Sequence, residues 1–166
     1  MKRTVGNAVC LVGLAVGLCS VAHGELLVHY TFDDGSGTTA ANSVGGGLYA
    51  GLLQGWSGEP TWTNGMVGSG ALQFNGAQYV DVQAAVIPAT ADFTTMGWID
   101  TSSSETGALL GQGMYVTNNG TTDWTRLILY ATNKDYEHHA RVYLGSQVGL
   151  SDFPTNDGEW HHVALF

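Results

Sequence analysis

The sequence predicts an all-β protein, an antiparallel sandwich of two sheets. Apolar and polar residues alternate over short runs, which is typical of strands with one buried side. Glycine is abundant, with 24 of 166 residues, and Thr, Val, Tyr and Trp recur between the glycine-rich turns. No stretch repeats apolar residues at helical spacing for long enough to predict a helix.

The first 24 residues have the pattern of a secretory signal peptide. Lys2 and Arg3 form a basic start, an apolar run covers residues 9–21, and Ala22 and Gly24 are small residues of the kind a signal peptidase requires. We expect cleavage after Gly24, with Ala22 as the alternative site, which leaves residues 25–166 as one secreted domain. The apolar run is shorter than the roughly 20 residues that span a bilayer, so we expect no membrane insertion after cleavage.

The composition of residues 25–166 narrows the class of ligand. Both cysteines, Cys10 and Cys19, lie in the predicted signal, so the exported domain has no thiol for a disulfide or a nucleophile. Without Lys2 and Arg3, three basic residues stand against fourteen acidic ones, which leaves a formal charge of −11. Such a surface repels nucleic acid and anionic lipid, and it suits a neutral ligand, a cationic ligand or a divalent metal.

The first half of the domain is predicted to contain four strands. Residues 26–32 alternate as a strand that ends in a turn at Asp33-Asp34-Gly35, and residues 48–53 form a second short strand. Residues 71–82 carry two apolar runs on either side of Asn75-Gly76, which predicts a β-hairpin because both turn positions tolerate positive φ.

The second half continues the pattern. In residues 93–99 the alternation places Trp98 on the face opposite Phe93, so Trp98 lies on the outside if the Phe93 face points inward. The alternative is that loops or the other sheet cover Trp98. We expect two short strands in 108–116 and a tight turn at 118–120, then single strands at 124–130 and 139–144, a loop at 149–157 and a last strand at 159–166.

An ordered series of motifs carries a resemblance to a known family. The series resembles the laminin-G-like, concanavalin A-like jelly-roll domains of secreted bacterial proteins over residues 26–166. Its members are F-D-x-G-S-G-T at 32–38, P-x-W at 60–62, G-A-L-Q-F-x-G-x-x-Y-V at 70–80, D-F-T-x-x-x-W at 92–98 and D-G-x-W-H-H-V-A at 157–164. In that family several more strands follow the last motif, so the resemblance implies an incomplete jelly roll that aggregates when expressed alone.

The resemblance also implies a calcium site and no catalysis. In the family, calcium lies at the turn after the first strand and at nearby glycine-rich loops, which correspond here to Asp33, Asp34 and Asn42, with Asn75 as a weaker possibility. The family often has an acid at the position of Asn42, and the alternative is that both aspartates only cap a turn. Jelly-roll glucanases carry an E-x-D-x-E-like run on one strand, and this sequence has none.

Aromatic residues supply the candidate ligand contacts, because their faces stack on sugar rings. The candidates are Trp56, Trp98, Trp124 and Tyr136, with Tyr115 also available. The histidine pairs 138–139 and 161–162 are poor zinc ligands, since adjacent strand residues point to opposite faces. We therefore expect a secreted, non-catalytic module that binds a glycan or an extracellular protein. The alternatives are an accessory domain of a secreted hydrolase and an adhesion domain without a small ligand.

Overall fold

The structure, a computed structural model, describes residues 24–88, 91–118, 121–144 and 147–166. In these ranges the chain is all-β, its strand pairs are antiparallel, and its two helices are single 3₁₀ turns, as the sequence predicted. The predicted signal peptide, residues 1–24, lies outside the described part apart from Gly24. Within the described part, no helix is long and apolar enough to cross a membrane.

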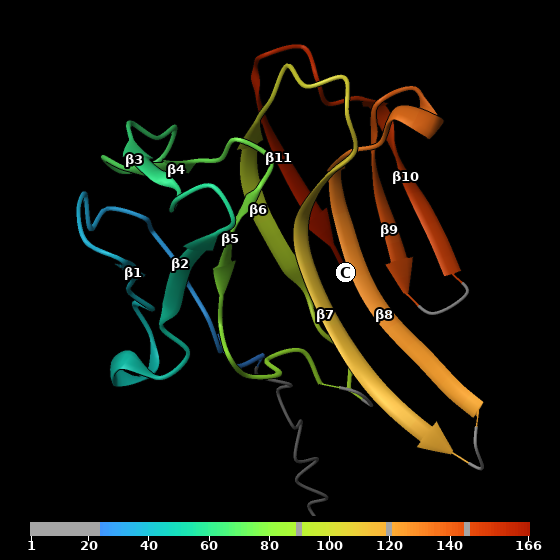
Figure 1. Ribbon diagram of the computed structural model, residues 1–166. Coiled ribbons are helices and arrows are strands. Elements are labelled where there is room, and N and C mark those ends of the chain that lie inside the picture. The colour runs from blue at the N-terminus through green and yellow to red at the C-terminus, as the bar shows by residue number, and fades with distance from the viewer. Residues whose placement is uncertain (1–23, 89–90, 119–120, 145–146) are drawn as a thin grey trace, which may run out of the picture.

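The largest sheet has four strands in the order β10-β9-β8-β7 (Figure 1). Its strands are β7 (Gly107–Asn118), β8 (Thr121–Thr132), β9 (His139–Leu144) and β10 (Gln147–Pro154). Asn118 pairs with Thr121, which agrees with the predicted turn, although residues 119–120 lie outside the described part. Two predictions were wrong. Residues 108–116 belong to one long strand, because pairing of β7 with β8 overrides the local Gly signals. Most of the expected loop at 149–157 is β10, because pairing with β9 overrides the local Gly and Pro signals.

Strands β6 (Thr95–Asp100) and β11 (Trp160–Leu165) form a separate two-stranded sheet. Its inner face packs on the four-stranded sheet. A Cβ at Gly97 would lie 3.8 Å from Leu109 of β7, and the ring centroids of His161 and Phe153 are 5.4 Å apart. Ile99 is buried on this side. Two antiparallel layers therefore face each other, as expected of a β-sandwich.

The N-terminal part forms two small sheets (Figure 1). The first has the order β1-β2-β5, and the second pairs β3 with β4. These strands are β1 (Thr39–Ala40), β2 (Gly51–Gly55), β3 (Thr61–Thr63), β4 (Ala71–Gln73) and β5 (Gln78–Asp81), and a 3₁₀ turn, η1 (Gly45–Gly47), lies between β1 and β2. Leu53 of β2 is buried in this part.

The hairpin predicted around Asn75-Gly76 was wrong. The chain does turn there, and the side chain of Asn75 accepts a hydrogen bond from Ala77 N at 3.1 Å. However, β4 pairs with β3 and β5 pairs with β2, so the two strands belong to different sheets. The type I′ turn of a tight hairpin needs positive φ at both central residues, and here only Gly76 has it, with φ of 90°.

The strand predicted over residues 26–32 was also wrong. Only Tyr30 makes a β-bridge, with Asn42, and Phe32 has φ of 57°, which breaks an extended conformation. The side chain of Asn42 instead takes the role of a neighbouring strand. It accepts from His29 N at 2.8 Å and donates to Leu48 O at 2.8 Å.

Candidate functional site

Trp98 lies on the outer face of the β6–β11 sheet. Exposure alternates along β6, and Trp98 is 42% exposed while Ile99 is buried, so its side chain points outward, which is one of the two alternatives that the sequence left open. His162 pairs with Trp98 in register, and the two ring centroids are 5.2 Å apart. Asp100 and Trp160 form the next pair on this side, which we call the Trp98 face.

The other predicted tryptophans lie elsewhere. Trp56 is 93% exposed at the end of β2, where its amide donates to Ala77 O at 3.1 Å. The side chain of Trp124 lies outside the described part, and only its place on β8, opposite Tyr115, is defined. Among the predicted aromatic residues whose side chains the structure describes, Trp56, Trp98 and Tyr136 belong to different sheets or turns and do not form one site.

Tyr136 lines a groove at one end of the four-stranded sheet. Tyr136 belongs to η2 (Lys134–Tyr136), the 3₁₀ turn between β8 and β9, and is 38% exposed. The groove is shallow and open to solvent, with a volume of about 380 Å³. Its lining residues are Asp135, Tyr136, Glu137, His139, Leu150 and Ser151. We call this site the Tyr136 groove.

A bulge in β10 forms one wall of the groove. Leu150 pairs with Arg141 but Pro154 pairs with His139, so the intervening part of β10 has two more residues than a regular ladder allows. The hydroxyl of Ser151 replaces the missing backbone partner and accepts from Ala140 N at 3.0 Å. The bulge thereby places Leu150 and Ser151 against the start of β9.

The guanidinium of Arg141 stacks on the ring of Tyr136. Its Cζ lies 3.6 Å from the ring centroid, and Arg141 is only 7% exposed. Such a cation–π contact contributes about 2 kcal/mol when the cation is shielded from water. One face of the ring is therefore held by the protein, and the exposed part of the ring needs little ordering before it contacts a ligand.

The polar groups of the groove are mainly hydrogen-bond acceptors. Asp135 and Glu137 are exposed carboxylates. His139 Nδ1 lies 2.6 Å from Ser151 O, and because a carbonyl only accepts, this nitrogen carries the proton. In the neutral ring, Nε2 is then an acceptor as well. Such a lining suits a ligand rich in donors, such as the hydroxyl groups of a sugar.

The residues predicted to bind calcium have hydrogen-bond partners within the protein. Asp33 Oδ1 accepts from Ser69 N at 2.6 Å, from Ser69 Oγ at 3.0 Å and from Gly70 N at 2.8 Å. These hydrogen bonds, with Ser69 first, lower the pKa of Asp33 below its ordinary value of 3.8. Asp34 Oδ2 accepts from Ala41 N at 3.3 Å. Asp33 thus anchors the loop that precedes β4.

The two asparagines of the calcium prediction do not join the aspartates. Both ends of the Asn42 amide are hydrogen-bonded to backbone, and Asn75 instead donates to Ser57 Oγ at 3.2 Å. In the described ranges, no cluster of three or more His, Cys, Asp or Glu residues could hold a metal ion. As arranged here the four residues do not fit one calcium site, and calcium binding stays a prediction for titration to test.

Several residues of the Tyr136 groove were not predicted. The sequence indicated Tyr136 but not Asp135, and because residues 149–157 were expected to form a loop, Ser151 was missed. His138 and His139 were considered only as zinc ligands. The sequence did contain one signal for this groove: an aromatic residue stands between two acidic ones at Asp135-Tyr136-Glu137.

Comparison of the chain with protein-family models, with curated proteins and with solved structures finds no match. The resemblance to laminin-G-like domains therefore stays a prediction, and the candidate site depends on its own geometry.

Proposed function

We propose that this chain is a secreted, non-catalytic binding module of the concanavalin A-like, jelly-roll type, and that it binds a neutral carbohydrate in the Tyr136 groove. One observation carries the proposal. An exposed aromatic ring, held from one side by Arg141, lies in a groove whose polar groups are acceptors. Sugar rings present apolar C–H groups to an aromatic face and hydroxyl donors to carboxylates.

The charge of the domain supports a neutral ligand over an anionic one. The sequence after the predicted signal peptide contains fourteen acidic and three basic residues. Two of the acidic residues, Asp135 and Glu137, line the groove. An acidic polysaccharide or a nucleic acid would be repelled. A neutral oligosaccharide avoids this repulsion and can donate hydrogen bonds to Asp135 and Glu137.

The test is a glycan array of neutral and charged oligosaccharides, followed by calorimetry with the strongest binder. We expect Tyr136→Ala to lower the affinity about 10- to 100-fold, since the aromatic contact contributes about 1.5–3 kcal/mol. Tyr136→Phe keeps the ring and should stay within about threefold of the parent. Glu137→Gln should cost about tenfold, because a hydrogen bond to a charged acceptor contributes about 1.5 kcal/mol.

Trp98→Ala is the matched control, because it removes an exposed aromatic side chain from the other sheet. It should leave the affinity unchanged. The opposite result, with loss of binding in Trp98→Ala and none in Tyr136→Ala, would transfer the function to the Trp98 face. Release of reducing sugar by the parent protein would contradict the non-catalytic assignment.

A further inference from the structure

The groove is bordered by a backbone corner with an unfavourable conformation. Glu137 and His138 follow each other with φ of 52° and 64°, and neither is a glycine. A left-handed conformation is unfavourable for each such residue, so two in succession need support from their surroundings. The corner lies between η2 and β9, and it sets the positions of Tyr136 on one side and His139 on the other.

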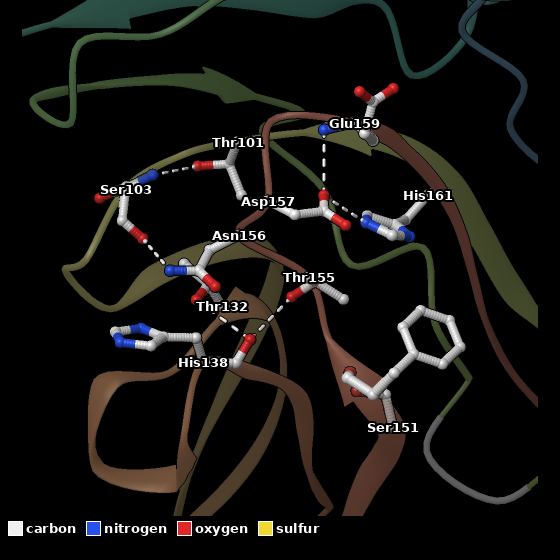
Figure 2. A network of polar contacts seen from close by, with 11 residues as sticks. Thr101, Ser103, Thr132, His138, Ser151, Thr155, Asn156, Asp157, Glu159 and His161 are labelled. Atoms are coloured by element: carbon white, nitrogen blue, oxygen red, sulfur yellow. Dashed lines mark hydrogen bonds and ion pairs between the residues drawn. The ribbon is translucent and has the colours of Figure 1, made fainter.

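The carbonyl of His138 supplies that support by accepting three hydrogen bonds, and Figure 2 shows the two that come from the hydroxyls of Thr132 and Thr155. Thr155 donates from its backbone nitrogen and from Oγ1, both at 3.0 Å, and Thr132 donates from Oγ1 at 3.3 Å. Thr155 is 0% exposed and Thr132 is 1% exposed. Hydroxyl donors buried this deeply lose hydration, so leaving either one without an acceptor is unfavourable.

The other side of the corner is fixed as well. The amide nitrogens of Tyr136 and His138 both donate to Asn133 O at 3.0 Å, and Asn133 is 4% exposed. The corner is therefore held between the end of β8 and the segment that follows β10. These two segments form its anchors, whereas the groove residues themselves remain at the surface.

The segment that carries Thr155 is anchored in turn (Figure 2). Asn156 Nδ2 donates to Ser103 O at 3.3 Å, and Gly158 N donates to Thr101 O at 3.0 Å. Asp157 Oδ1 lies 2.8 Å from His161 Nε2 on β11. Thr155 is thus held against the loop after β6 and against β11, and it supports the corner from a fixed position.

From this geometry we infer that Thr155, assisted by Thr132, is a positioning residue of the Tyr136 groove. Its hydroxyl holds the His138 carbonyl, which keeps the Glu137–His138 corner left-handed and keeps Tyr136 and Glu137 oriented toward the ligand. The inference rests on the proposed function for its meaning in binding. The positioning itself can be measured without any ligand.

The experiment compares Thr155→Val with Thr155→Ser in the full chain. Valine keeps the shape and removes the donor, whereas serine keeps the donor. We expect amide hydrogen exchange at Tyr136 and His138 to accelerate about five- to tenfold in Thr155→Val, as loss of one hydrogen bond implies. Thr155→Ser should remain within about twofold of the parent. Exchange in β6 should not change in either variant.

Affinity for the strongest array binder gives a second readout. It should fall in Thr155→Val and recover in Thr155→Ser. If Thr155→Val does not fold, Thr132→Val replaces it, with a smaller acceleration at the same amides because its bond is longer. Unchanged exchange at Tyr136 and His138, or a uniform acceleration across β6 and the corner alike, would overturn the inference. Local acceleration without any carbohydrate binding would refute the proposed function alone.

Discussion

Replacing Gly70 by alanine tests the contact between the segment before β4 and the N-terminal segment. Gly70 N donates to Asp33 Oδ1 at 2.8 Å, and the backbone of Gly70 lies directly against Phe32. A Cβ at this position would be 2.9 Å from the carbonyl carbon of Phe32, closer still to its oxygen, and 3.1 Å from Asp33 Cα. Real Cβ atoms essentially never approach another heavy atom within 3.0 Å.

The clash of Gly70→Ala involves backbone atoms, which no rotamer change can move. The segment must therefore shift, and this shift also lengthens the hydrogen bond to Asp33. We expect a loss of about 3 kcal/mol in the free energy of unfolding, the upper end of the usual range for over-packed sites. For a domain of this size, that loss lowers the melting temperature by about 10 °C.

Differential scanning calorimetry of Gly70→Ala beside Gly111→Ala checks this value. Gly111 lies in β7, has no positive φ and has nothing within 4 Å of a Cβ built on it. Alanine there should be neutral or stabilise the domain by about 0.5 kcal/mol, since glycine in a strand is entropically unfavourable. Equal melting temperatures for the two variants would refute the close approach of Gly70 to Phe32.

Two more predictions concern the acidic side chains. The pKa of Asp157 is lowered by its hydrogen bonds with His161 and Glu159 N, and that of Asp33 by Ser69. Because these pKa values are lower in the folded state, the two carboxylates stabilise the fold at pH values above the ordinary pKa of 3.8, and this contribution is lost as the pH falls below it. The melting temperature should therefore fall below this pH, and Asp33→Asn should make that fall smaller. For calcium, the family-derived prediction is tested by comparing the melting temperature with Ca²⁺ and with chelator, and equal temperatures would count against the site. A calcium-dependent rise that Asp33→Ala removes would instead support the family-derived site.

Local alternation predicted the last strand, but it also predicted a strand over residues 26–32 that does not form, because pairing between distant segments decides which alternating runs become strands. A period of two placed Trp98 opposite Phe93 but left open whether loops or the other sheet cover it, and the structure shows it exposed. The hairpin at Asn75-Gly76 failed because only one of its two turn residues has positive φ. The Tyr136 groove could not be derived, since the bulge opposite His139 arises from the register between β9 and β10.

The groove combines two local features that a stable sheet does not need. A regular ladder between β9 and β10 would pair every residue, yet two extra residues interrupt it. A glycine would adopt the left-handed corner at little cost, yet Glu137 and His138 adopt it. Both features lie beside the same exposed tyrosine, since Glu137 of the corner and Ser151 of the bulge line its groove. Because departures from the lowest-energy backbone tend to cluster where a protein binds or reacts, their meeting at Tyr136 favours this groove as the binding site over the regularly paired strands around Trp98.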